Sequence, residues 1–202
     1  MIALAVLLSV QVADAQTKSP DAAKKAVAAA EAAAENPKKA AKVATWVKLA
    51  SSYMDAYNAP AGSAWVGASK QELQLLMGGQ QPLAVENVEL GGEALVKETY
   101  ADKDFYFNGA GQLVLIDVTK PVVENALAKA IDAYKKAYEV DVKKSKIKDI
   151  TGGLEIVARK YMDEAMNAYT FGDLAKASEL FEAAADASAI EPLAKNDTTA
   201  LY

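Results

Sequence analysis

Residues 161–188 read YMDEAMNAYTFGDLAKASELFEAAADAS, two helix-length segments on either side of Gly172-Asp173. Small and aromatic residues recur along both segments at intervals of three or four: Tyr161, Ala165, Tyr169, Ala177, Phe181 and Ala184. Residues at this spacing share one face of an α-helix. The stretch therefore predicts two antiparallel helices, from about Thr151 to Phe171 and from Leu174 to Ser188, joined by a tight turn.

Helical patterns continue toward the N-terminus. Ser19-Pro20-Asp21 has the residues preferred at a helix start, and Asn36-Pro37 predicts both the end of this helix and the cap of the next one. The next helix, Lys38 to Tyr57, carries an apolar stripe: Val43, Trp46, Val47, Ala50, Tyr53 and Met54. After Pro121 the same periodicity predicts a helix ending near Val140.

Composition agrees with a helical protein. Of the 202 residues 52% are apolar, with alanine prominent, and 7% are aromatic. Alanine is the strongest helix former and lets helices approach closely. We therefore expect an all-α fold of antiparallel helix pairs, with one interruption.

The interruption covers residues 59–120. A short helix is predicted at Ser69 to Met77, and three stretches rich in aromatic and β-branched residues are predicted as strands: Leu95 to Tyr100, Lys103 to Asn108 and Gln112 to Val118. Gly109-Ala110-Gly111 between the last two predicts a β-hairpin. We expect an outward excursion, with the helices around Tyr53 and Tyr134 still in contact.

The helical part resembles the tetratricopeptide repeat family, whose first helix carries Trp-x2-Leu-Gly-x2-Tyr and whose second carries Ala-x3-Phe. Trp46-x2-Leu49-Ala50-x2-Tyr53 matches the first half with alanine in place of glycine. Ala130-x3-Tyr134 matches the second half after the interruption, and Tyr161 to Ala184 gives an unbroken match. The similarity points to exported repeat proteins of gram-negative bacterial envelopes, and it implies a short solenoid. An irregular helical bundle is the alternative.

The resemblance assigns two sets of residues. Repeat packing would use Trp46, Leu49, Ala50, Tyr53, Ala130, Tyr134, Ala137, Tyr161, Ala165, Ala177, Phe181 and Ala184. A concave groove that binds a peptide or protein would be lined by Val47, Ser51, Met54, Asp55, Arg159, Met162, Met166 and Tyr169. Methionine adapts to varied apolar partners. Ordinary core packing is the other interpretation of the methionines.

Four segments follow from these patterns. Residues 1–15 have an apolar run ending in Ala13-Asp14-Ala15, which predicts a cleaved signal peptide too short to span a membrane, and hence an exported, periplasmic or outer-membrane-associated protein. Residues 16–58 and 121–202 are the repeat-like helices, with 59–120 inserted between them. Asp197 to Tyr202 resembles the start of a further helix.

The residue inventory disfavours several functions. The chain has no histidine and no cysteine, which removes the usual nucleophile and zinc chemistry. The net charge is −5 and Arg159 is the single arginine, so nucleic acid is not an expected partner. Tyr106 and Phe107 stand where an EF-hand needs an oxygen ligand and glycine. We expect no metal, no cofactor and no enzymatic activity.

One rival class remains, because a pair of carboxylates is enough for glycoside hydrolysis. The insertion supplies Glu86, Glu89, Glu93, Glu98, Asp102 and Asp104. It also supplies Trp65, Tyr100, Phe105, Tyr106 and Phe107, which could bind a glycan or close a small sheet. A deep pocket with two facing carboxylates would favour the enzyme, and an open groove would favour partner binding.

Overall fold

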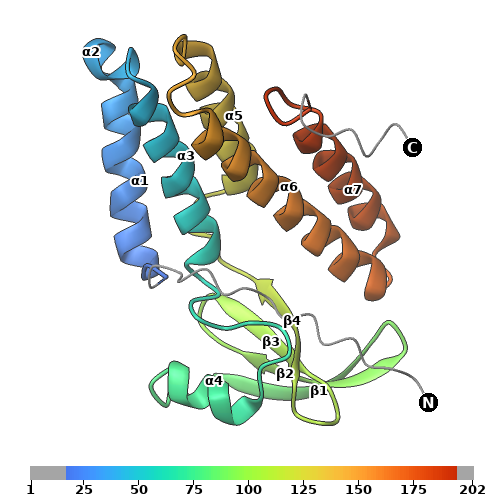
Figure 1. Ribbon diagram of the computed structural model, residues 1–202. Helices are drawn as coiled ribbons and strands as arrows, with labels where there is room; N and C mark the ends of the chain where they lie inside the picture. The colour runs from blue at the N-terminus through green and yellow to red at the C-terminus, as the bar shows by residue number, and fades with distance from the viewer. Residues whose placement is uncertain (1–16, 195–202) are drawn as a thin grey trace, which may run out of the picture.

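A computed structural model describes residues 17–194, and the predicted signal peptide and the predicted helix after Asp197 lie outside this range. Of the described residues 54% are helical and 15% are in strands, arranged as seven helices and a four-stranded antiparallel sheet (Figure 1). The predicted all-α class is therefore wrong, and the fold is mixed. The error comes from treating the predicted strands of residues 59–120 as a small insertion in an all-α protein, whereas with β1 they build a four-stranded sheet.

The N-terminal helices begin and end at the predicted caps. In α1 (Pro20–Glu35) the Ser19 hydroxyl accepts a hydrogen bond from the Ala22 N–H at 3.4 Å. The Asn36 side chain accepts from the N–H groups of Lys38 and Lys39 at 3.1 and 3.3 Å and so starts α2 (Pro37–Ala40). The sequence predicted one helix from Lys38 to Tyr57, but the chain breaks before α3 (Val43–Asn58).

Five long helices form the main body. They are α1, α3, α5 (Ala126–Val140), α6 (Ile147–Thr170) and α7 (Leu174–Ser188). Each packs against the next one in this order, and α3 also contacts α6 (Figure 1). The predicted contact between the helices of Tyr53 and Tyr134 is confirmed, because α3 packs on α5. One continuous hydrophobic core is buried between α1, α3, α5 and the first half of α6.

Two tyrosines of α3 cross-link this array. The Tyr53 hydroxyl donates to Glu31 on α1, and the Tyr57 hydroxyl donates to Glu164 on α6, each at 2.7 Å. Burial, and then the nearby Glu164 carboxylate, raise the pKa of Tyr57 far above its ordinary value. Burial, and then the hydrogen bond to Glu31, raise the pKa of Tyr53 as well, so both phenols stay protonated and act as donors.

The sheet has the order β1-β2-β3-β4, a meander of antiparallel strands. Its strands are β1 (Ala84–Leu90), β2 (Glu93–Thr99), β3 (Lys103–Phe107) and β4 (Leu113–Val118). Three strands and the β3–β4 hairpin agree with the sequence prediction, but β1 was missed. The short helix α4 (Lys70–Leu76) packs against the sheet through Leu73 and starts with a capping box formed by Ser69 and Glu72.

The sheet and α4 enclose a second hydrophobic cluster, separate from the core of the helices. Its buried members are Ala68, Leu73, Tyr100, Phe105, Phe107 and Leu113. The rings of Phe105 and Phe107 meet edge to face, with centroids 6.3 Å apart. The two clusters share no residue. The sheet region therefore has a hydrophobic core of its own.

The turn between β1 and β2 nevertheless returns to the helices. Gly91 has φ +59°, and a Cβ placed on it would lie 2.5 Å from the carbonyl oxygen of Thr170, at the end of α6. Figure 1 shows this hairpin end just below the turn between α6 and α7. The insertion is thus more than an outward excursion, because it touches the helices at a second place far from its two ends.

Candidate binding surface

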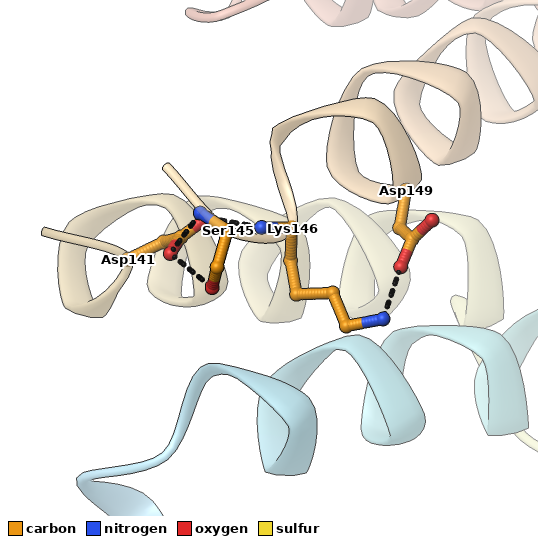
Figure 2. A network of polar contacts seen from close by, with 4 residues as sticks. All are labelled: Asp141, Ser145, Lys146 and Asp149. Carbon is orange, nitrogen blue, oxygen red and sulfur yellow. Dashed lines mark hydrogen bonds and ion pairs between the residues drawn. The ribbon is translucent and has the colours of Figure 1, made fainter. Parts of the chain in front are cut away.

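The helix that carries half of the predicted groove begins in a compact polar network. Asp141, only 2% exposed, accepts hydrogen bonds from the Ser145 N–H, the Ser145 hydroxyl and the Lys146 N–H at 2.8, 2.9 and 2.7 Å (Figure 2). Lys146 in turn pairs with Asp149 at 2.8 Å. Burial raises the pKa of Asp141, but these hydrogen bonds outweigh it, so its pKa lies below the ordinary value. The network fixes the direction in which α6 leaves α5.

One face of α6 is buried. Ile150, Leu154 and Val157 are fully buried in the main core, and Ala165 is buried as well. Ala165 and Ala177 are both at most 2% exposed where α6 and α7 pack together. Small residues at these places allow close approach of the two helices, as the resemblance implied.

The opposite face of α6 is exposed and carries four of the predicted groove residues: Arg159, Met162, Met166 and Tyr169. Their spacing of three, four and three residues aligns them along the helix. Met162, Met166 and Tyr169 are 45%, 49% and 58% exposed. We call these four residues the α6 stripe. Along a helix whose other side is fully packed, it presents three large apolar side chains and one guanidinium.

The four groove residues predicted on α3 lie in a different environment. Met54 is 8% exposed within the main core, and Val47 packs against that core. The Ser51 hydroxyl donates to the Lys48 carbonyl of its own helix, and Asp55 forms an ion pair with Lys18. The structure does not join these residues to the α6 stripe as one open groove. For Met54, the alternative interpretation of the methionines as ordinary core residues is therefore correct.

The residues predicted to pack the repeats are in the interior of the helical array. Nine are buried: Leu49, Ala50, Tyr53, Ala130, Tyr134, Ala137, Ala165, Ala177 and Ala184. Trp46, Tyr161 and Phe181 are partly buried. The Trp46 indole N–H donates to the Ala40 carbonyl at 2.7 Å, which ties α3 to the end of α2.

The aromatic residues of the insertion mostly hold the sheet together. Tyr100, Tyr106, Phe105 and Phe107 are at most 8% exposed, whereas Trp65 is 48% exposed. A glycan could therefore reach Trp65 but not the rings within the sheet. The interpretation in which the aromatics close a small sheet describes these four residues.

The carboxylates proposed for hydrolysis are divided between ion pairs and solvent. Glu98 pairs with Lys70 at 2.7 Å, and Asp102 pairs with Lys103 at 2.9 Å. Asp104 pairs with Lys97 at 2.9 Å through one oxygen, while its other oxygen is buried without a hydrogen-bond partner. Three further carboxylates are exposed: Glu86, Glu89 and Glu93. Among residues 17–194 no group of three or more acidic residues is arranged to hold a metal ion.

No protein-family model, curated protein or solved structure matches the chain. In the described part of the chain, no helix is long and apolar enough to cross a membrane.

Sequence reasoning missed two features of this surface. One is β1, whose outer edge faces no other described strand. The other is the contact of Gly91 with the end of α6. Gly91-Gly92 between two stretches of alternating apolar and polar residues is a hairpin signal that could have revealed β1.

Proposed function

We propose that the protein is a non-enzymatic binding or scaffold module of the tetratricopeptide type that holds a protein or peptide partner on the α6 stripe. The observation that supports this is the exposure of Met162, Met166 and Tyr169 along one side of α6. Soluble proteins seldom expose several large apolar side chains together unless the surface contacts something. The proposal concerns α6, because Met54 of α3 is buried.

The chemistry of the stripe indicates the kind of partner. Methionine side chains are flexible and polarisable, so they fit apolar surfaces of differing shape. Arg159 adds a cation that can pair with a carboxylate. A partner helix with an apolar face and an acidic residue beside it would satisfy both requirements.

The proposal also places the protein in the bacterial envelope, on the basis of the export signal predicted for residues 1–15 and of the resemblance to exported repeat proteins. The same signal would be removed before the protein acts. Export is tested by determining the N-terminal residue of protein recovered from the periplasm. Recovery with Met1 intact would count against cleavage after Ala15.

The binding proposal is tested with a variant of the α6 stripe and a control variant on α7. The first carries Arg159→Glu, Met162→Glu and Met166→Glu, at exposed positions where charge does not enter the core. The control carries Leu174→Glu and Lys176→Glu on the exposed face of α7. Both are expected to unfold at nearly the wild-type temperature, because exposed changes seldom alter stability by more than about 0.5 kcal/mol.

Affinity capture from envelope extract then separates the outcomes. Partners retained by wild type and by the α7 variant should be lost from the α6 variant. A folded α6 variant that retains the same partners would refute the assignment of this stripe. Turnover of a glycoside substrate, abolished by Asp104→Asn, would instead support the carboxylate enzyme.

A further inference from the structure

The strand β1 forms one edge of the sheet, and its outer side is open within the described part of the chain. It pairs with β2 over seven consecutive residues, Ala84 to Leu90, with no bulge. Its side chains are exposed or partly exposed at every position. A long, regular and open edge strand is a template on which another extended chain can pair.

The other edge of the sheet is covered in part by the protein itself. The Gly67 N–H donates to the Leu113 carbonyl at 2.7 Å, and the Leu113 N–H donates to the Ala68 carbonyl at 2.8 Å. Ser69 forms a bridge with Gln112. The start of β4 therefore already has a main-chain partner, whereas β1 has none on its outer side among residues 17–194.

The hydrogen-bond pattern identifies the main-chain groups that are open. The Leu83 N–H donates to the Thr99 carbonyl at 2.7 Å, so the main-chain groups of Thr99 point toward β1. In antiparallel sheets hydrogen-bonded and non-hydrogen-bonded pairs alternate. The register then assigns the following residues to bonding with β2: Ala84, Glu86, Val88 and Leu90. Val85, Asn87 and Glu89 direct their N–H and carbonyl groups outward.

This edge is acidic. Glu86 and Glu89 lie on β1 on opposite faces of the sheet, and Glu93 begins β2 across from Leu90. All three are exposed and none has an ion pair in the described structure, whereas Lys97, the nearest cation in register, is held by Asp104. An incoming strand therefore meets Glu89 on one face of the sheet, and Glu86 and Glu93 on the other, where Glu86 also interacts with Lys97 across from it.

The edge is also held in place at its turn. The backbone of Gly91 packs against the Thr170 carbonyl, which anchors the β1–β2 turn to the end of α6. An edge that is already ordered loses little further conformational freedom when a strand adds to it.

From these observations we propose that β1 binds an extended, lysine- or arginine-rich segment of a partner protein by strand addition to the sheet. Main-chain bonds to Val85, Asn87 and Glu89 supply the pairing, and Glu86, Glu89 and Glu93 select basic side chains. A second copy of the chain fits less well, because two acidic edges would meet. This surface is distinct from the α6 stripe.

The test uses two soluble peptides, one alternating valine with lysine and one alternating valine with glutamate. The mature chain is expected to bind the lysine peptide and not the glutamate peptide, by calorimetry at low salt. Reversal of two charges, Glu86→Lys and Glu89→Lys, should weaken binding about tenfold. The control, Glu179→Lys and Glu182→Lys on exposed α7, changes the net charge equally and should bind nearly as wild type.

A second measurement separates strand addition from loose charge attraction. The lysine peptide should slow amide hydrogen exchange at Val85, Asn87 and Glu89. Asn87→Pro removes one outward N–H without removing a bond to β2, and proline is tolerated on edge strands, so this variant should fold and bind less well. Equal binding of both peptides, slowed exchange elsewhere only, or self-association through β1 in sedimentation would overturn the proposal.

Discussion

Gly153 of α6 lies directly against the ring of Tyr134 on α5. A Cβ placed on Gly153 would lie 2.1 Å from Tyr134 Cζ and 2.3 Å from its hydroxyl oxygen. The tyrosine is 5% exposed, and burial raises its pKa, with smaller contributions from Asp149 and Asp55. The two helices can approach here because one of them has no side chain.

Substitution of this glycine should be destabilising although alanine favours helices. Gly153→Ala is expected to lower the free energy of unfolding by about 1–3 kcal/mol, the usual cost of overpacking a core. Gly152→Ala is the matched control, because a Cβ there meets no atom within 4 Å. It should raise stability by about 0.5–1 kcal/mol. Urea unfolding followed by circular dichroism distinguishes the two, and equal effects would contradict the contact.

The contact between the β1–β2 turn and α6 can be tested in the same way. Gly91→Ala and Gly92→Ala both place a side chain at positive φ, +59° and +82°, but only the first meets the Thr170 carbonyl. Both should destabilise, and Gly91→Ala should cost at least about 1 kcal/mol more. Thermal unfolding measures the difference. If the two variants unfold at one temperature, the turn does not dock on α6.

The bond from Tyr57 to Glu164 should contribute to stability. Tyr57→Phe leaves a partly buried carboxylate without its donor and is expected to cost about 1–2 kcal/mol. The comparison is Tyr138→Phe, because the Tyr138 hydroxyl meets Glu191 at 3.2 Å in an exposed setting. That change should cost less than about 0.5 kcal/mol. Guanidinium unfolding of both variants at neutral pH provides the measurement.

Stability should depend on Asp141 at acid pH. The folded state lowers the pKa of this carboxyl below its unfolded value of about 3.9. Its stabilising contribution is therefore complete above about pH 4, and it is lost as the pH falls through the lower folded pKa. Asp141→Asn should reduce stability at pH 7 and show a smaller further loss below pH 4 than wild type. The control is Asp186→Asn, because this exposed α7 side chain makes no hydrogen bond or ion pair within the described part of the chain.

Local signals in the sequence located most of the helices. Ser19 and Asn36 act as the caps that their identity and position predict. The glycine pair Gly152-Gly153 lies near the start of the predicted helix Thr151 to Phe171, and glycine is unfavourable inside helices. Its role is visible only in the fold, because Tyr134 is nineteen residues earlier in the chain and meets it through packing of two helices.

The sheet was underestimated for a physical reason. Strand β1 has the sequence AVENVEL, in which acidic and amide residues interrupt the apolar ones, because the strand is exposed and has few core contacts. A strand that is buried on one face can be recognised because apolar and polar residues alternate along it. This alternation is weak in an exposed edge strand. The buried strand β3, KDFYF, was predicted correctly.

The sequence prediction placed residues of α3 and α6 in one groove, and this failed for a related reason. Helical periodicity identifies residues that share a face, but it does not say whether that face meets a neighbour or solvent. Met54 and Met166 were both assigned to the groove, yet Met54 is 8% exposed within the main core and Met166 is 49% exposed.

The separation of the two hydrophobic clusters has a consequence for slow fluctuations. Proteins open in cooperative units that coincide with local cores. Since the sheet and α4 share no buried residue with the helical array, their amides can exchange with solvent through a partial opening that leaves the helices intact. The amides of Phe105 and Leu113 should then report a smaller opening free energy than those of Leu154 and Val157. A strand bound at β1 would raise the opening free energy of the sheet amides and so reduce this difference.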